Sequence, residues 1–241
     1  QFSGFVFKIQ ANMDKNHRDR IAFLRICSGK FERGMAATHV QSGKKLKLAV
    51  GTSMMAEDRA IVDEAYAGDI VGLFDPGIFS IGDTICAGKD LVQYPPMPTF
   101  APEHFARITQ INTLKRKQFM KGCEELSQEG AIQLFRQVGT STESMIVGVV
   151  GVLQLDVLER RLQTEYGVDV RRQGLGYTQI RWILNDRSTY RLSDLKLTSS
   201  TCQVEDMRGN RLLLFNSPWD VNFAVEHNPD IEFSEFGNIS F

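Results

Sequence analysis

Four prolines within eight residues impose the strongest limit on how this chain can fold: Pro95, Pro96, Pro98 and Pro102. Proline has no backbone N–H and a fixed φ, so a regular helix or a central strand does not continue through such a segment. Before it, hydrophobic residues alternate in short runs, and after it they recur at helical spacing. The 241 residues are therefore predicted to form two domains, 1–94 and 104–241, joined by a linker over 95–103.

The first predicted domain has the pattern of an all-β barrel. Two alternating runs are each expected to place their apolar side chains on one strand face: Phe5, Phe7 and Ile9 in one, and Ala22, Leu24 and Ile26 in the other. Glycine turns follow at 28–30, 32–34, 42–44, 67–69 and 82–84. Because glycine reaches positive φ without steric cost, this spacing favours short strands closed into a barrel.

The second predicted domain mixes helices and strands. Apolar spacing indicates helices over 114–129 and 153–166, each followed by a glycine, Gly130 and Gly167, as a helix C-terminus prefers. Strands are expected over 105–111, 131–136, 145–150 and 168–171. This order is the split βαβ pattern of an α/β domain. A further α/β tail is expected, with a helix starting at Ser217 and Pro218.

Composition excludes disordered, collagen-like and highly charged chains. Hydrophobic residues make up 42% and charged residues 24%, which is an ordinary globular mixture. The longest apolar run, 146–153, is too short for a membrane helix. The four cysteines are far apart and include no CxxC pair, which is typical of buried, reduced thiols in the cytosol. The chain opens at Gln1 and runs at once into a strand pattern, so we interpret it as a piece of a longer protein.

Charge is unevenly distributed within the first predicted domain. Residues 1–47 carry ten Lys and Arg against three acids, whereas residues 48–95 carry two against eight. A cationic edge of this kind can follow a phosphate backbone while the whole chain stays near neutral. The alternative is a solvated face whose cations pair with the acidic half of the same domain. The charge pattern alone leaves both interpretations open.

The motifs of nucleotide and metal chemistry are missing from the 241 residues. No Gly-x-x-x-x-Gly-Lys-Ser/Thr loop occurs, so no set of backbone N–H groups is aimed at a triphosphate. The turn at 148–151 follows a predicted strand and precedes a helix, as in a dinucleotide site, but it lacks the first glycine of that fingerprint. Its glycines equally suit close packing of a helix on a sheet. No catalytic, cofactor-binding or metal-binding residue is therefore predicted.

Several segments carry a resemblance to a known family. Residues 4–14 (GFVFKIQANMD) and 17–31 (HRDRIAFLRICSGKF) resemble the second domain of bacterial peptide-chain release factor three, a class II release factor. Residues 65–72 and 81–84 are similar to turns found more widely in domain two of translational GTPases. Residues 99–105, 148–154 and 234–237 resemble the third domain of that release factor family, so the resemblance covers nearly the whole chain.

The resemblance implies an elongation-factor-type β-barrel followed by an α/β domain three, both lying after a GTPase domain. The family is a ribosome-dependent GTPase that ejects codon-reading release factors after peptide release. GTP or GDP and magnesium are expected in the intact protein, and none in this piece, whose status as an enzyme stays open. The implied partners are small-subunit ribosomal RNA and protein, the release factors, and the protein's own GTPase domain. A cytoplasmic monomer without membrane contact is expected.

Two groups of cations become candidate ribosome contacts. The first is the proposed RNA-facing edge of the barrel: Arg18, Arg20, Lys30, Arg33, Lys44 and Lys45. Such residues would contact phosphates without reading bases. The second heads the first helix of the later domain: Lys115, Arg116, Lys117 and Lys121. Alternatives are pairing of the first group with the GTPase domain, a solvated surface for the second, another translational GTPase domain, and a standalone RNA-binding or adaptor module.

Overall fold

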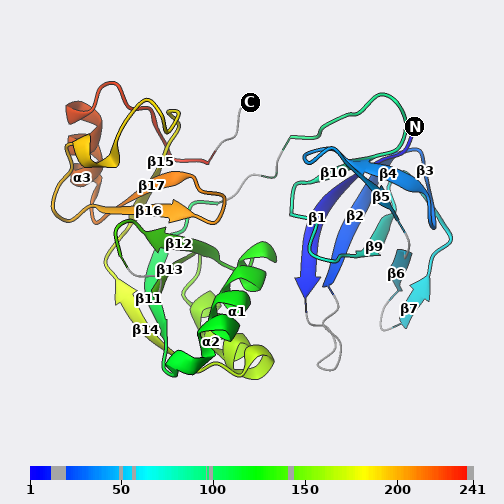
Figure 1. Ribbon diagram of the computed structural model, residues 1–241, viewed down its shortest axis with the longest axis horizontal. Helices are drawn as coiled ribbons and strands as arrows, with labels where there is room; N and C mark the ends of the chain where they lie inside the picture. The colour runs from blue at the N-terminus through cyan, green and yellow to red at the C-terminus, as the bar shows by residue number, and fades with distance from the viewer. Residues whose placement is uncertain are drawn as a thin grey trace. The chain divides into compact units, whose positions relative to one another are not determined.

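The structure, a computed structural model, describes residues 1–11, 20–48, 51–55, 58–95, 97, 100–140 and 144–237, and leaves the side chains of 51–61 undescribed. Two compact units are present: Gln1–Met97 with Gln128–Gly130, and Pro98–Ser127 with Ala131–Phe241. Figure 1 shows strands in the first unit, and both helices and strands in the second. The predicted domain bounds and linker stay a prediction.

The first unit is a curled antiparallel sheet. Its strands are β1 (Ser3–Ala11), β2 (Arg20–Ser28), β3 (Lys30–Glu32), β4 (Ala36–His39), β5 (Lys44–Lys47), β6 (Gly51–Met55), β7 (Asp58–Ile61), β8 (Glu64–Tyr66), β9 (Ile70–Phe74) and β10 (Thr84–Cys86). Eight of them follow the order β5-β4-β10-β1-β2-β9-β6-β7, and β3 pairs with β8. In the part of the chain that is described, β5 and β7 are therefore the edges of the large sheet, and the predicted barrel class is confirmed.

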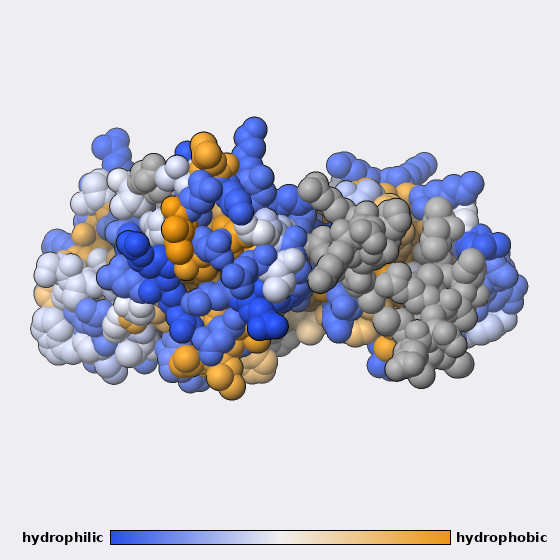
Figure 2. All heavy atoms as spheres, turned by 90° about the horizontal axis from the view of Figure 1, so that it is seen from below, coloured by the Kyte–Doolittle hydropathy of each residue, from blue (hydrophilic) through white to orange (hydrophobic). Residues whose placement is uncertain are grey.

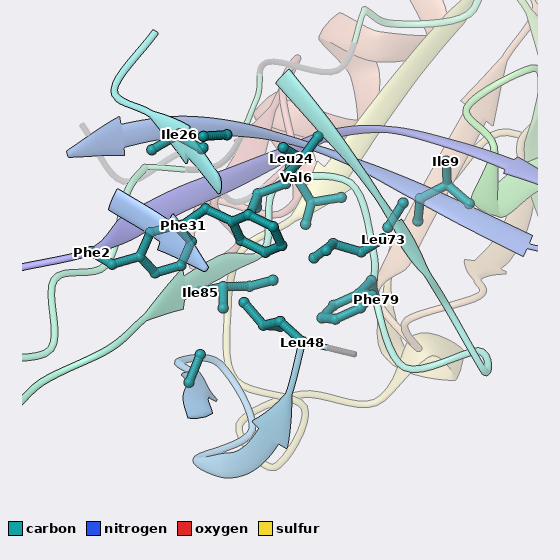
Figure 3. Close-up of a cluster of buried hydrophobic side chains, with 14 residues drawn as sticks. Phe2, Val6, Ile9, Leu24, Ile26, Phe31, Leu48, Leu73, Phe79 and Ile85 are labelled. Atoms are coloured by element: carbon teal, nitrogen blue, oxygen red, sulfur yellow. The ribbon is translucent and has the colours of Figure 1, made fainter. Parts of the chain in front are cut away.

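The core of this unit lies inside the curl, where aliphatic and aromatic side chains from different strands converge (Figure 3). Ala22, Leu24 and Ile26 of β2 are fully buried, as their alternation predicts. The prediction for β1 was wrong, because Val6 is buried with Ile9 while Phe5 and Phe7 are half-buried. The pairing shifts between Val6 and Lys8, so a β-bulge at Phe7 reverses which side chains face inward.

A buried polar cross-link holds the β4–β5 hairpin against the turn that precedes β10. The Asp83 carboxylate lies 2.7 Å from His39 Nε2, and His39 Nδ1 lies 2.6 Å from Ser42 Oγ. Gln41 Oε1 accepts the N–H of Thr84 at 2.9 Å, and Asp83 also accepts the N–H of Ser80 at 2.6 Å. The position of the strand that follows, β5, is thus fixed by side chains of the hairpin as well as by sheet pairing.

The second unit contains three α-helices, two 3-10 helices and eight paired strands in the described residues. Its elements are β11 (His104–Gln110), the 3-10 helix η1 (Thr113–Lys115), α1 (Arg116–Gln128), β12 (Gln133–Gln137), β13 (Ser144–Val149), α2 (Leu153–Tyr166), β14 (Val170–Leu175), β15 (Gln179–Ile183), the 3-10 helix η2 (Leu192–Asp194), β16 (Cys202–Asp206), β17 (Arg211–Phe215), α3 (Pro218–His227) and β18 (Phe233–Ser234). The strands form one sheet in the order β14-β11-β13-β12-β16-β17-β15-β18.

The first half of this sheet is the predicted split βαβ arrangement. β13 lies between β11 and β12 and is antiparallel to both, while α1 and α2 connect the strands. Helix α2 has the predicted bounds and ends at Gly167, whose φ of 65° is the left-handed conformation that glycine favours. Helix α1 buries Phe119, Cys123 and Leu126 in the same core.

Close packing of the two helices depends on Gly122 of α1. A Cβ atom there would lie 2.7 Å from Leu162 Cδ2 and 2.9 Å from Tyr166 Cγ, both on α2. Glycine-to-alanine changes in exposed helices usually stabilise by about 1 kcal/mol, but here we expect Gly122→Ala to lower the free energy of unfolding by about 1–3 kcal/mol. Urea unfolding followed by circular dichroism measures the change.

The matched control for Gly122→Ala is Gly174→Ala in β14. No atom lies within 4 Å of the position of its added Cβ. We therefore expect the control to change the free energy of unfolding by less than about 0.5 kcal/mol. A gain in stability for Gly122→Ala would show that α1 and α2 are not packed at the distance the structure gives.

The other half of the sheet forms two further cores. Side chains of β15, β16 and β17 pack with the second face of β11 to β13, including Trp182, Val204 and Leu214. Leu213 and Phe215 point to the opposite face of β17 and pack against α3. Figure 1 shows α3 at the end of the unit away from α1 and α2. Ser217 caps α3 with Pro218 at its first turn, as predicted.

Asp220, in the first turn of α3, has a pKa held below its ordinary value, chiefly by hydrogen bonds from the hydroxyl groups of Thr198 and Ser217. Such a carboxylate stabilises the fold above its unfolded pKa and stops doing so as pH falls through its lower folded pKa. We expect Asp220→Asn to lower the free energy of unfolding near pH 7. The gap in free energy of unfolding between this variant and the wild type should shrink below pH 3.8, the ordinary pKa of the carboxyl group. Urea unfolding from pH 3 to pH 7 tests this, and a difference that grows on acidification would contradict it.

Figure 2 shows the molecule from the side on which α1 and α2 lie in Figure 1. Hydrophilic side chains cover much of this face of the second unit, with apolar side chains interspersed among them. Exposed apolar residues in and beside these helices include Ile111, Leu114, Leu153 and Val157. Apolar residues scattered in this way are common on soluble domains, so they define no site by themselves.

Candidate nucleic-acid interface

Three exposed cations of the first unit lie on β5, an edge of its large sheet. Lys44, Lys45 and Lys47 are exposed, while Leu46 between them packs toward the core. In the part of the chain that the structure describes, none of the three lysines forms an ion pair. An exposed strand with three unpaired ammonium groups can follow a phosphate backbone. We name Lys44, Lys45 and Lys47 the β5 lysines.

A hollow of about 320 Å³ opens beside the β5 lysines. Its lining comes from β5, from the end of β9 and from the loop that follows β9: Lys45, Leu46, Lys47, Leu48, Leu73, Phe74, Pro76, Ile78 and Phe79. Lysine stems rest favourably on apolar surface of this kind while their ammonium groups stay in water. The hollow thus supports the lysine side chains at the edge of the barrel.

Two other predicted contacts, Lys30 and Arg33, have acidic partners within the same unit. Pairing of β3 with β8 places Lys30 Nζ 2.7 Å from Glu64 and 3.0 Å from Glu32. The hydrogen bond to Glu64, followed by that to Glu32, raises the pKa of Lys30, and Lys30 lowers the pKa of Glu64. Arg33 Nε lies 2.9 Å from Asp63. These contacts match the alternative in which the cationic and acidic halves of the domain pair with each other.

Arg20 has a different environment from the exposed cations. Its side chain is 12% exposed, and its Nε lies 2.6 Å from the fully buried carboxylate of Asp75. A second guanidinium N–H donates to the carbonyl of Phe79 at 2.6 Å. The other Asp75 oxygen accepts the N–H groups of Gly77, Ile78 and Phe79 at 2.9, 2.7 and 3.2 Å. Arg20 therefore holds a loop inside the barrel. Arg18, another residue of the predicted group, lies outside the described residues.

The second predicted group of cations, at the start of α1, is only partly available to bind an external anion. Lys115 Nζ donates to the carbonyl of Gly167 at the C-terminus of α2, a position where a cation is favourable. Lys121 lies 3.4 Å from Glu125, one turn along the helix. Arg116 and Lys117 are exposed. Lys117 forms no ion pair with the described residues, so it is the clearest candidate for an external anion.

The turn at 148–151 is built for packing. The side-chain oxygen of Gln154 accepts the N–H groups of Val150 and Gly151 at 3.0 and 2.9 Å. A Cβ at Gly148 would lie 2.7 Å from Pro102 Cγ, so this glycine permits close approach of the chain. The N–H groups that a phosphate would need are occupied, which supports the packing interpretation over a dinucleotide site.

The described residues contain no group of three or more His, Cys, Asp or Glu side chains that could hold a metal ion. No helix among them is long and apolar enough to span a membrane. Cys86, Cys123 and Cys202 are buried, and burial raises the pKa of the Cys123 thiol to about 12. Cys27 is exposed, contrary to the expectation that all four thiols are buried.

Two features of the structure are absent from the predictions made from the sequence. Lys47 is one of the ten cations of residues 1–47 but is not part of the predicted group with Lys44 and Lys45, although strand alternation places it on the same face as Lys45. Trp219, Phe223 and His227 lie four residues apart along α3 and form a row of aromatic rings, of which Trp219 and His227 are exposed. The spacing of four residues was visible in the sequence and could have identified that row.

Comparison with known proteins agrees with this architecture. The first unit belongs to a class of domain found in translation factors, because residues 1–88 match the family model of elongation factor G domain 2. Residues 94–225 match the model described as the C-terminal domain of class II release factor RF3. The chain belongs to the class II release factor RF3 family.

Relatives in several bacteria match nearly the whole chain. It is 48% identical over 233 residues to "Peptide chain release factor 3" of Symbiobacterium thermophilum, which covers 97% of this chain and 43% of that protein. Proteins of the same name from Listeria monocytogenes and Gloeobacter violaceus are 47% and 45% identical, covering 96% and 97% of this chain. The chain thus spans less than half the length of these curated relatives.

A solved structure shows a similar fold. A crystal structure of a protein from Thermus thermophilus matches with a TM-score of 0.60 at 20% identity, and the match covers 85% of this chain and 30% of that one. This likeness concerns the fold alone.

Proposed function

We propose that this chain is the ribosome-binding portion of a cytoplasmic, monomeric, ribosome-dependent GTPase that promotes dissociation of codon-reading release factors after peptide release. The observation that carries the proposal is the match of residues 94–225 to the release factor model beside an elongation-factor domain over 1–88. GTP and magnesium would bind in the rest of the intact protein. Since the chain contains no phosphate-binding loop, none of its residues is assigned to nucleotide chemistry.

Within this function, the β5 lysines are the proposed contact with phosphates of small-subunit ribosomal RNA. Their exposure, their position on an edge strand and the absence of ion pairs with the described residues support this role. Lys30 and Arg33 could join them by exchanging exposed carboxylate partners for phosphates. Arg20 is left out because it is paired with Asp75 inside the barrel. Lysine acts as a point charge, so positioning without base recognition is expected.

The intact protein tests the proposed function directly. Ribosomes that have released their peptide and carry a fluorescent codon-reading release factor are mixed with the intact protein and GTP, and the rate at which the fluorescent factor dissociates is measured. We expect the intact protein to accelerate dissociation and a variant with all β5 lysines changed to Glu to lose that acceleration. Dissociation at the spontaneous rate with the wild-type protein would contradict the proposal.

The main alternative is a standalone RNA-binding or adaptor module, which the basic edge strand would also suit. Binding of free RNA hairpins and of assembled ribosomes by the intact protein separates the two functions. We expect assembled ribosomes to bind more tightly, because several surfaces of both units would then be engaged at once. Equal affinity for both would favour the general RNA-binding module.

The cations at the start of α1 are proposed as a second, smaller contact. Changing Lys115, Arg116, Lys117 and Lys121 to Ala is expected to weaken ribosome binding about 10-fold, the effect of roughly one lost phosphate contact, since Lys115 and Lys121 have partners in the unit. Lys117→Ala alone should reproduce most of this loss, and Lys121→Ala little of it. Wild-type affinity for the fourfold variant would reject this contact.

A further inference from the structure

A row of aromatic side chains follows one flank of α3. The Trp219 and Phe223 ring centroids are 5.7 Å apart, and the Phe223 and His227 rings stack at 4.0 Å with an interplanar angle of 19°. Trp219 is 65% exposed and His227 is exposed, while Phe223 is half-buried. We name these three residues the α3 aromatic row. Large aromatic side chains exposed together in this way are characteristic of binding surfaces.

The helix that carries the α3 aromatic row is firmly held. Val221 and Ala224 pack into the core formed with β17, and the buried Asn228 side chain donates to the carbonyls of Ala224 and Lys196 at 2.7 and 2.9 Å. Thr198 Oγ1 donates to the Asp220 carboxylate at 2.7 Å. These contacts occupy the inner face of α3, so the row on its flank is presented in a fixed orientation. A rigid, preorganised surface loses little entropy on binding.

The surroundings of the row are acidic. From Ser217 to the last residue the chain has five acids and no Lys or Arg. Glu226, Asp230 and Glu232 are exposed, and none of them forms an ion pair with another described residue. The exposed Lys196 is the cation tied most directly to this helix, through its backbone bonds to Asn228. Arg191, at the start of η2, is a second exposed cation near α3, since η2 packs in the same core. Three unpaired carboxylates against these two cations leave an excess of negative charge, which disfavours phosphates.

We propose that the α3 aromatic row is the docking site for a segment rich in Lys and Arg on a protein of the ribosome. Aromatic faces attract ammonium and guanidinium groups, and the carboxylates of Glu226, Asp230 and Glu232 complement the same cations. RNA is the less suitable occupant because its phosphates meet those carboxylates. This inference rests on the proposed function, since it takes the partner to be part of the ribosome. It adds a protein contact on α3 to the RNA contact of the β5 lysines.

Photocrosslinking identifies what the row touches. The intact protein is prepared with the photoreactive amino acid p-benzoylphenylalanine in place of Trp219, bound to ribosomes and irradiated, and the crosslinked molecule is sequenced. We expect a crosslink to a Lys- and Arg-rich segment of a ribosomal protein. The control places the same amino acid at Val225, which is 48% exposed on another side of α3 and should crosslink far less. A crosslink to RNA, to a protein segment without basic residues, or to nothing would overturn the proposal.

Affinity gives an independent readout. Trp219→Ala in the intact protein is expected to weaken ribosome binding about 30-fold, the loss typical of a central aromatic contact, and Glu226→Lys should weaken it in the same direction. Val225→Ala is expected to bind as the wild type does. Unchanged affinity for Trp219→Ala, with circular dichroism showing a folded protein, would overturn the docking site and leave the proposed function standing. A wild-type protein that fails to bind ribosomes would overturn both.

Discussion

Asp75→Ala is expected to lower the free energy of unfolding of the barrel unit by about 3–5 kcal/mol, a large part of the stability of a domain of this size. The carboxylate is fully buried and lies 2.6 Å from Arg20 Nε. Its other oxygen accepts the N–H groups of Gly77, Ile78 and Phe79. Alanine would leave a nearly buried guanidinium without its counter-charge and three backbone donors without an acceptor. Each of these losses is costly in an apolar interior.

An exposed ion pair of the same unit provides the control. Asp63→Ala removes the partner of Arg33, where both side chains are well exposed and water replaces the lost contact. We expect that change to cost less than about 1 kcal/mol. Urea unfolding, fitted for the barrel transition separately from that of the second unit, measures both variants. Equal effects of Asp75→Ala and Asp63→Ala would contradict the role assigned to Arg20 and Asp75.

Changing all three β5 lysines to Glu is expected to weaken binding of the intact protein to ribosomes by about 100-fold or more, on the order of what three lost phosphate contacts cost near 0.1 M salt. Each contact releases condensed cations, so the dependence of log affinity on log salt should also become shallower, by about two to three. Ribosome pelleting across a salt series measures affinity and slope together. Because these lysines are exposed, the variant is expected to fold as the wild type does.

A charge-matched variant shows whether the effect is local. Lys89, Arg160 and Arg208 are also exposed and form no ion pair with the described residues, so changing them to Glu alters the net charge equally. We expect this control to bind within a few-fold of the wild type. Equal losses in the two triple variants would mean that overall charge, and not the β5 edge, controls binding. If the slope of log affinity against log salt were unchanged in the β5 variant, the β5 lysines would instead be paired with the GTPase domain.

Local patterns predicted the elements of the second unit well. Helix α2 was predicted over the residues it occupies, because its apolar spacing and the following Gly167 are both local signals.

The buried face of β1, in the first unit, was predicted wrongly. Its alternation is broken by a bulge at Phe7, which depends on pairing with β2 and is not visible in the sequence of β1. Register between strands is a tertiary property, so a one-residue shift reverses the predicted buried face.

The candidate site also combines features that local sequence predicts with features that depend on the fold. The excess of cations in residues 1–47 was visible in the sequence, but their partners depend on the fold. Lys30 meets Glu64, 34 positions away in sequence, only because β3 pairs with β8. Arg20 reaches Asp75 because β2 pairs with β9, with Ile21 opposite Phe74. The lysines that stay unpaired on β5 were therefore distinguishable only once the sheet order was known.

Directed hydroxyl-radical probing gives the most direct test that the β5 edge faces ribosomal RNA. An iron chelate is attached to a cysteine replacing Lys45 in a protein whose exposed Cys27 is changed to Ser, and the ribosome-bound protein is activated to cleave nearby nucleic acid. The chelate on the native Cys27, which lies on β2 and four strands from β5 in the sheet order, serves as the comparison. We expect strong cleavage of small-subunit ribosomal RNA from position 45 and weaker cleavage from position 27. Bound protein that cleaves no RNA from position 45 would contradict the assignment of this edge to the ribosome.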